Sequence, residues 1–283
     1  EGLDREVLRK CGLPFEGQPD LKSWEEFLYK MKNPKYSVEI GLVGKYVELK
    51  DSYKSIMESF VHAGTYNQVK VELRMIHSEF FFFFFLSEKL SGLHGILVAP
   101  GFGIRGIEGK ILAIHYARTR GIPFLGICLG MQCAVIEFAQ NVMGLKKANS
   151  TEFDPRTPDP VIDIMEQQKK ISGMGGTMRL GAYPCQLMEG SKSRNIYKVP
   201  LILERHRHRY EFNNKYLEQF EQAGMIAAGI NPKENLVEIV EIPKHPWFIG
   251  VQFHPEFKST VASPHPLFIS FVEAACLHLE QNT

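Results

Sequence analysis

A single cysteine stands in a glycine-flanked turn between an apolar run and a segment with helical periodicity. The apolar run covers residues 122–125 and the turn reads Gly-Ile-Cys-Leu-Gly at residues 126–130. This order predicts a buried strand that enters a helix through a tight turn with Cys128 at its apex. Gly126 and Gly130 would let strand and helix pack closely. The thiol would then face a helix N-terminus, where the positive end of the helix dipole favours a thiolate.

Composition and charge limit the class of protein. The chain has 283 residues, of which 44% are hydrophobic, and this predicts one large domain with at most a short appendage. A formal net charge of +1 gives no electrostatic reason to expect a nucleic acid or an anionic membrane as partner. The five cysteines lack CxxC spacing, which disfavours a disulfide framework or a zinc site and favours a reducing, cytoplasmic compartment. No signal peptide is visible, and the chain starts at Glu1, so we expect a piece of a longer protein.

Strand-like and helix-like segments alternate along most of the chain. Residues 1–34 read as a charged helical arm that is interrupted by prolines, and residues 154–176 read as a loop. Strands are expected at 38–44, 69–76, 95–98, 122–125, 178–187, 201–212, 237–242 and 248–253, and helices at 52–63, 107–120, after the cysteine turn and at 266–280. The alternation predicts an α/β fold with a mainly parallel central sheet flanked by helices, with added antiparallel strands in the second half.

Residues 80–85 are six consecutive phenylalanines. Such a run has no amphipathic period and would promote aggregation if it were exposed. A buried strand and a poorly defined or substituted loop both fit it, and we assign it no function.

A cysteine nucleophile needs a base, and the base needs a group that orients it. His254 follows a strand-like apolar run, so its side chain can face the same cleft as Cys128. Glu256, two residues further on, can bond the far ring nitrogen and fix the tautomer. Taken alone, one of ten histidines is more often structural, and a small-x-Cys-x-small turn can be a packing feature. The order Cys…His-x-Glu is much more specific.

Acyl transfer also needs two N–H donors aimed at the developing oxyanion. The turn supplies one of them, the N–H of Leu129. The second can come from Pro-Gly-Phe-Gly at residues 100–103, because glycines let the backbone turn an N–H inward. An ordinary turn is the alternative interpretation of this loop.

Together these motifs resemble those of the class I (triad) glutamine amidotransferases. The finer similarity is to the glutaminase domain of the CTP synthase family, and it covers roughly residue 38 to the end. It is carried by residues 149–153, 175–181, 204–211 and 252–257. The resemblance implies a flavodoxin-like fold, with residues 1–37 as a linker arm from a missing N-terminal synthetase domain and residues 38–283 as the glutaminase domain.

The resemblance also implies a role for each matching residue. Cys128 would attack the side-chain amide of L-glutamine to give a thioester and ammonia, with His254 moving the proton and Glu256 orienting it. Leu129 and Gly101 would donate to the oxyanion. The implied glutamine-binding residues are Gly101, Leu129, Gly130, Met131, Gln132, Glu152 and Arg209.

The two charged residues of this set suit a free amino acid. Glutamine is a zwitterion, so its pocket requires an acid to bind the α-ammonium (Glu152) and a guanidinium to bind the α-carboxylate (Arg209). Without the resemblance, Glu152 would be interpreted as a helix cap or surface acid. The Arg-His-Arg-His-Arg run at residues 205–209 would be interpreted as a solvated basic strand face.

The sequence departs from the family pattern at one position of the loop. Pro100 stands where the family usually has the first of two glycines, and proline has no N–H to donate. Gly101 can still serve as the donor. If the donor were residue 100, hydrolysis would be crippled.

The resemblance further implies partners and ligands. This domain would need no cofactor or metal, whereas ATP, Mg²⁺ and UTP would be used by the synthetase domain to form CTP in pyrimidine nucleotide biosynthesis. GTP would be an allosteric activator, and Arg105 and Arg179, expected in loops, are candidates to contact it. Surface arginines are the alternative. The full-length protein would form a homo-oligomer, a tetramer.

Two other functions stay open. One is a catalytically silent regulatory or docking module of the same fold, which Pro100 favours. The other is a glutaminase serving another pathway, or a γ-glutamyl hydrolase, which the match at residues 205–211 disfavours.

Overall fold

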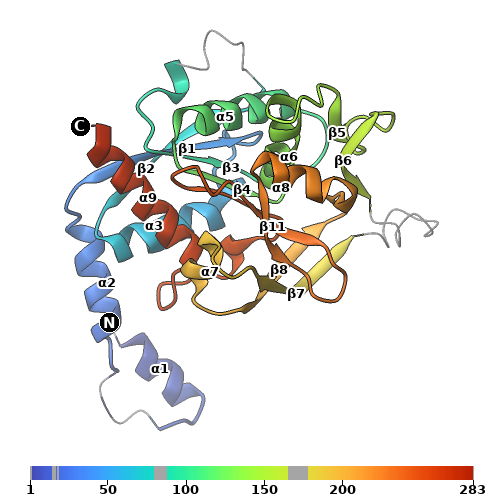
Figure 1. The fold of residues 1–283 in the computed structure, drawn as a ribbon. Coiled ribbons are helices and arrows are strands. Elements are labelled where there is room, and N and C mark those ends of the chain that lie inside the picture. The colour runs from blue at the N-terminus through green and yellow to red at the C-terminus, as the bar shows by residue number, and fades with distance from the viewer. Residues whose placement is uncertain (1, 15–16, 18, 80–87, 165–177, 283) are drawn as a thin grey trace.

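The structure is a computed structural model that describes residues 2–14, 17, 19–79, 88–164 and 178–282. Its centre is a nine-stranded sheet with the strand order β2-β1-β3-β4-β12-β11-β10-β7-β8 (Figure 1). A smaller three-stranded sheet, β5-β6-β9, lies at one end. The phenylalanine run at residues 80–85 falls outside the described residues.

One half of the large sheet is parallel, as the alternating pattern predicts. Its strands are β2 (Lys70–His77), β1 (Ser37–Gly44), β3 (Gly95–Val98), β4 (Phe124–Ile127) and β12 (Phe248–Val251). All four residues of β3, of β4 and of β12 are buried. Strands covered on both faces read as continuous apolar runs, which is why the sequence located them.

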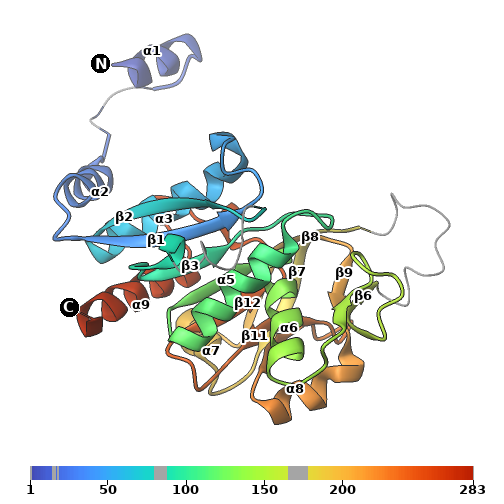
Figure 2. The same ribbon diagram turned by 90° about the horizontal axis from the view of Figure 1, so that it is seen from above.

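Helices cover both faces of this parallel half (Figure 2). The helices α3 (Lys54–Asn67) and α9 (Pro266–Asn282) pack together over one face, where Phe60 and Phe268 meet edge to face. The helices α5 (Ile107–Arg120) and α6 (Leu129–Asn141) pack together over the other. The hydrophobic core is therefore divided by the sheet into two clusters.

The other half of the large sheet is antiparallel, which confirms the expected additions in the second half of the chain. Its strands are β11 (Val237–Glu241), β10 (Ile226–Ile230), β7 (Arg179–Leu187) and β8 (Leu201–His208). The small sheet consists of β5 (Ala148–Ser150), β6 (Asp159–Ile164) and β9 (Tyr210–Phe212). Short helices are α7 (Lys192–Tyr197), α8 (Leu217–Ala223) and three 3₁₀ turns, η1 (Lys50–Tyr53), η3 (Asn214–Tyr216) and η4 (Pro255–Phe257).

Two expectations about this second half were wrong. Residues 154–176 were expected to be a loop, yet β6 lies within them and pairs with β5 and β9. Residues 201–212 were expected to be one strand, but the chain breaks at Arg209 and continues as β9 in the other sheet. Local patterns do not register such a change of sheet, because the hydrophobic alternation continues on both sides of the break.

The N-terminal arm forms the two expected helices, α1 (Leu3–Lys10) and α2 (Lys22–Lys32). Neither contributes a buried residue in the part of the chain that the structure describes. Figure 2 shows α1 well away from the sheet, while α2 contacts α3. Among the described helices, none combines the length and apolar character needed to span a lipid bilayer.

Candidate active site

The three predicted catalytic segments meet at one edge of the parallel sheet. Cys128 follows β4, His254 follows β12, and the loop of residues 99–103 follows β3. Because β3, β4 and β12 are adjacent and parallel, their carboxyl ends lie side by side. The fold therefore brings together residues that are more than a hundred positions apart in the sequence.

Cys128 sits in a sharp, strained turn. Its φ of 52° and ψ of −103° are unusual for a residue with a side chain. The turn is held by a 2.7 Å hydrogen bond from the Cys128 N–H to the carbonyl of Val251 in β12. A Cβ added at Gly126 would lie 2.8 Å from the backbone of Gly130, and one at Gly130 would lie 2.2 Å from the carbonyl oxygen of Val98. The two glycines thus permit the close approach that the sequence predicted.

We expect Gly130→Ala to destabilise the fold strongly, because the new methyl group would collide with a backbone carbonyl in the sheet. The expected loss is about 2–4 kcal/mol of unfolding free energy, in the upper range for overpacking in a core. Gly144→Ala is the control, since nothing lies within 4 Å of its added Cβ and only its φ of +78° is unfavourable. Urea unfolding of both variants measures the difference, and equal losses would show that the turn is not closely packed.

The sulfur of Cys128 is nearly buried and has two polar neighbours. The side-chain amide of Gln252 donates to Sγ over 3.6 Å, and Sγ lies 3.9 Å from the carbonyl oxygen of Arg207. Gln252 is fully buried, and its own oxygen accepts from the amide of Gln132 at 3.2 Å. An amide donor stabilises a thiolate. The sequence analysis assigned no role to Gln252. Its position directly after β12, two residues before His254, could have indicated that its side chain lies close to Cys128.

His254 and Glu256 form a tight buried pair. Nδ1 of His254 lies 2.7 Å from Oε1 of Glu256, and both side chains are less than a tenth exposed. Burial lowers the pKa of His254, but the interactions with Cys128 and Glu256 outweigh it and raise this pKa to about 10. The imidazole is therefore cationic at neutral pH. Its Nε2 atom is buried and has no hydrogen-bond partner among the described residues, and Cys128 contributes to the raised pKa.

The expected oxyanion donors also lie together. A Cβ built on Gly101 would be 3.3 Å from Cδ2 of Leu129, so the loop after β3 touches the start of α6. The N–H of Gly103 is already used, because it donates to Oε1 of Glu152 at 2.7 Å. Pro100 lies in the same loop and offers no N–H. The N–H groups of Gly101 and Leu129 are thus on neighbouring backbone segments beside Cys128.

Three of the predicted glutamine-binding residues gather around Tyr210. The amide of Gln132 donates to the Tyr210 carbonyl at 3.0 Å. Burial chiefly raises the pKa of the Tyr210 phenol, with Glu152 adding to the rise and the neighbouring Arg209 opposing it. The charges of an acid and of a guanidinium therefore both act on the Tyr210 phenol. Met131 is fully buried in the core of the domain, under the sheet.

The two arginines proposed to contact GTP have different environments. Arg105 is exposed, with Nε 2.7 Å from Oε1 of Glu79 and its guanidinium over the ring of Tyr46. Arg179 was expected in a loop, and that was wrong. It is the first residue of β7 and only 4% exposed, and its guanidinium faces the carboxylates of Glu211, Glu234 and Glu238. Its contact with GTP stays an untested prediction.

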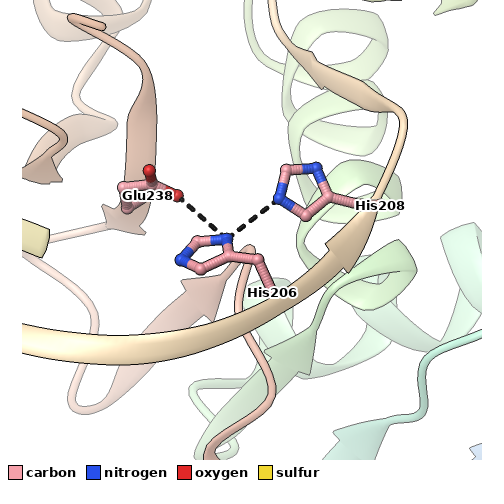
Figure 3. Close-up of side chains that lie close together, drawn as sticks. All are labelled: His206, His208 and Glu238. Atoms are coloured by element: carbon pink, nitrogen blue, oxygen red, sulfur yellow. Dashed lines mark hydrogen bonds and ion pairs between the residues drawn. The ribbon is translucent and has the colours of Figure 1, made fainter. Parts of the chain in front are cut away.

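Figure 3 shows a buried polar cluster formed by His206 and His208 of β8 and Glu238 of β11. In β8 the arginines at 205 and 207 point to solvent, whereas His206 and His208 point inward. Nδ1 of His206 lies 2.9 Å from Nε2 of His208 and 3.5 Å from Oε2 of Glu238. Burial lowers the pKa values of His206 to about 2 and of His208 to about 3, so both rings are neutral. The interpretation of this run as a solvated basic face therefore holds only for Arg205 and Arg207, because Arg209 is partly buried.

This cluster has ligand types that metals use. The donor atoms of His206, His208 and Glu238 lie within 4.8 Å of one another. However, the two imidazoles already bond each other, and Arg179 holds Oε1 of Glu238 at 2.7 Å. One nitrogen of each imidazole and one oxygen of Glu238 are therefore already engaged within the protein. The absence of a metal site stays a prediction from the sequence.

The chain matches a known protein family over most of its length. The sequence profile of the family described as "Glutamine amidotransferase class-I" matches residues 48–274. The chain is 62% identical over 278 residues to a CTP synthase of Christiangramia forsetii, covering 98% of this chain and 51% of that protein. It is 56% identical over 280 residues to a CTP synthase of Caldanaerobacter subterraneus subsp. tengcongensis, covering 99% and 52%. The chain therefore spans about half the length of the curated relatives it matches.

A solved structure is also similar over most of the chain. It is the CTPS glutaminase domain of Trypanosoma brucei with bound acivicin, and it superimposes with a TM-score of 0.80 at 38% sequence identity. The match covers 84% of this chain and 94% of that one. The α/β architecture expected from the sequence is thus also present in the solved structure of a relative.

Proposed function

Because this chain belongs to the class I glutamine amidotransferase family, we propose that it hydrolyses the side-chain amide of L-glutamine through Cys128. The observation that carries the proposal is the buried His254–Glu256 pair beside a cysteine held in a strained turn. A cationic imidazole next to a thiol supplies both a stabilised nucleophile and an acid for the leaving group. The similarity to a glutaminase domain supports the same conclusion.

The first half of the reaction releases ammonia. The Cys128 thiolate attacks the amide carbon, and the C=O electron pair moves onto oxygen, where the N–H groups of Leu129 and Gly101 stabilise the charge. His254 gives its proton to the amide nitrogen. The C–N bond then breaks, ammonia leaves, and a γ-glutamyl thioester remains on Cys128.

The second half regenerates the enzyme. The imidazole of His254, now neutral, takes a proton from water, and the resulting hydroxide attacks the thioester carbonyl at the same oxyanion site. The C–S bond breaks and glutamate leaves, so that the net reaction is glutamine plus water to glutamate plus ammonia. Glu256 keeps the ring in one tautomer and stabilises its cationic form in both halves.

The pocket for the substrate is proposed around Tyr210. Glu152 would receive the α-ammonium group and Arg209 the α-carboxylate, and Gln132 would contribute a polar side chain between them. The hydrogen bond from Gln132 to the Tyr210 carbonyl, and the effects of the Glu152 and Arg209 charges on the Tyr210 phenol, support this assignment. A bidentate guanidinium–carboxylate contact would give selectivity for a free amino acid over an amide within a peptide.

We further propose that the ammonia serves CTP synthesis. In this proposal, residues 1–37 are the linker arm and residues 38–283 the glutaminase domain of a longer, cytoplasmic protein. An N-terminal synthetase domain would use ATP, Mg²⁺ and UTP, GTP would activate hydrolysis, and full-length chains would form tetramers. The identity to CTP synthases that are about twice as long supports this proposal. So does the lack of buried residues among the described parts of α1 and α2.

Gly101→Pro tests which residue of the loop serves the oxyanion. We expect it to lower kcat by about 10²–10³-fold, the usual effect of removing one donor, because proline has no N–H. The comparison variant is Pro100→Gly, which adds an N–H and should change kcat much less. Steady-state ammonia release measures both. If Pro100→Gly instead raised kcat by two orders of magnitude (about 100-fold), the donor would be residue 100.

The function itself is tested by incubating the chain with glutamine and following ammonia and glutamate. Equal amounts of the two products support the proposal. A γ-glutamyl peptide offered in parallel distinguishes the hydrolase alternative, which would cleave it at a comparable rate. A chain that releases no ammonia and is not alkylated at Cys128 by a chloroketone analogue of glutamine would be a silent module.

A further inference from the structure

Two lysines lie buried directly beneath the loop that carries Gly101. Lys45 follows β1 and is 4% exposed, and Lys110 in α5 is fully buried. Neither is within ion-pair distance of a carboxylate among the residues that the structure describes. Burying an ammonium group without a counter-charge costs folding free energy, so the burial of these two lysines needs a physical explanation.

Both ammonium groups bond backbone carbonyls of this loop. Nζ of Lys110 donates to the carbonyl of Ala99 at 2.5 Å. Nζ of Lys45 donates to the carbonyl of Phe102 and, at 2.9 Å, to that of Gly103. The lysines thus bind carbonyls on both sides of Gly101. A Cβ built on Gly101 would lie 3.8 Å from Nζ of Lys110 and 3.9 Å from Cε of Lys45.

The lysines themselves are held in place by the fold. The hydroxyl of Tyr53 accepts from the backbone N–H of Lys45 at 3.1 Å, and it also packs against Gly44, where a Cβ would lie only 2.4 Å from it. Lys110 is the fourth residue of α5, and this helix packs against both β3 and α6. Both lysine side chains are buried, so their ammonium groups are shielded from solvent where they bond the loop carbonyls.

The charge environment of Lys110 shows how tightly it is enclosed. Burial lowers the pKa of Lys110 to about 8, with the thiols of Cys133 and Cys128 favouring the charged form and Lys45 opposing it. Burial also lowers the pKa of Lys45, against the opposing charge of Glu152. Cys128 is therefore within electrostatic reach of Lys110, and a negative oxygen forming on a substrate at Cys128 would be as well.

We propose that Lys45 and Lys110 are positioning residues for the oxyanion hole. By drawing the carbonyls of residues 99, 102 and 103 to their own side, they fix the orientation of the intervening peptide groups. The N–H of Gly101 is then presented toward Leu129 and Cys128 before substrate binds. Such preorganised dipoles stabilise the transition state without reorganisation during the reaction. This inference rests on the proposed glutaminase function.

The test replaces each lysine with methionine, which has a similar length and no charge. Lys110→Met and Lys45→Met are compared with Lys215→Met, an exposed lysine in η3. Three quantities are measured on each chain: the midpoint of urea unfolding, kcat and KM for glutamine, and the rate at which iodoacetamide alkylates Cys128. Alkylation displaces iodide at a saturated carbon, so it needs the thiolate but forms no carbonyl oxyanion.

We expect kcat to fall about 10- to 100-fold in both lysine variants, less than for direct loss of a donor. KM should stay within about threefold of the native value, because substrate binding does not depend on the loop carbonyls. The alkylation rate should fall by less than kcat, because Lys110 acts on the thiolate only through its charge whereas kcat also depends on the orientation of the loop. The unfolding midpoint of Lys110→Met should equal or exceed the native one, since an unpaired buried charge is removed. Lys215→Met should match the native chain throughout.

Several results would overturn the inference. An unchanged kcat in both variants, with the native chain active, would refute it and leave the proposed function standing. A parallel fall of kcat, alkylation rate and unfolding midpoint would assign the lysines a purely structural role. If the native chain released no ammonia from glutamine while Cys128 was readily alkylated, the proposed function would fail and the inference with it.

Discussion

Replacing Cys128 with alanine abolishes ammonia release from glutamine, with a fall in kcat of at least about 10⁴-fold, because no other group can form the thioester. The sulfur of the residue in the strained turn accepts from the amide of Gln252 over 3.6 Å and contributes to the raised pKa of His254. Glutamine binding should persist, since the residues around Tyr210 are untouched. Ammonia production under saturating glutamine measures the first effect, and isothermal calorimetry measures the second.

Cys276→Ala is the matched control for this variant. Cys276 is buried in α9, on the face of the sheet covered by α3, and it takes no part in the proposed site. Its removal tests whether loss of any buried thiol impairs the chain. Retention of more than a hundredth of native kcat by Cys128→Ala would exclude covalent catalysis by this residue, whatever the control does.

Replacing His254 with glutamine lowers kcat by about 10³- to 10⁴-fold, the upper range for loss of a general acid and base that serves both halves of a reaction. The thiol loses its cationic neighbour, and ammonia loses the proton that makes it a good leaving group. Because the pKa of His254 is raised to about 10, native activity should fall as the pH rises through that value and the imidazolium loses its proton. A pH–rate profile between pH 6 and about 11 measures this limb.

Glu256→Gln separates positioning from acid–base chemistry. The amide can still accept the hydrogen bond from Nδ1 but carries no charge, so the pKa of His254 should fall and the high-pH limb should move to lower pH. The loss in kcat at neutral pH should be smaller than for His254→Gln. If the high-pH limb of the pH–rate profile lay at the same pH in Glu256→Gln as in the native chain, a group other than His254 would control it.

The sequence identified the parallel half of the sheet and the catalytic segments for a physical reason. Fully buried strands such as β3 and β4 must be continuously apolar, and the helix expected at residues 107–120 has the same bounds in the structure. The glycine–cysteine turn encodes a close backbone approach that only glycine allows at residue 130. These features are local in the sequence, so they could be read without a structure.

Other parts of the site depend on contacts that no local pattern records. Lys45 and Lys110 appear in the sequence as ordinary polar residues of a strand end and a helix, and only the fold buries them under the loop after β3. Arg179 was expected in a loop, but its three carboxylate neighbours come from β9, β11 and the turn before β11, which no local pattern brings together. Gln252 gained its role only when β12 was found beside β4.

The central claim is that the γ-glutamyl group passes through the sulfur of residue 128 during turnover. It is tested by quenching the reaction with acid while glutamine is saturating and analysing the digested chain by mass spectrometry. We predict a peptide containing Cys128 that carries one glutamyl group, that is lost on treatment with hydroxylamine, and that is absent from Cys128→Ala. Ammonia release at the native rate with no such adduct, or with the adduct on another residue, would contradict the account.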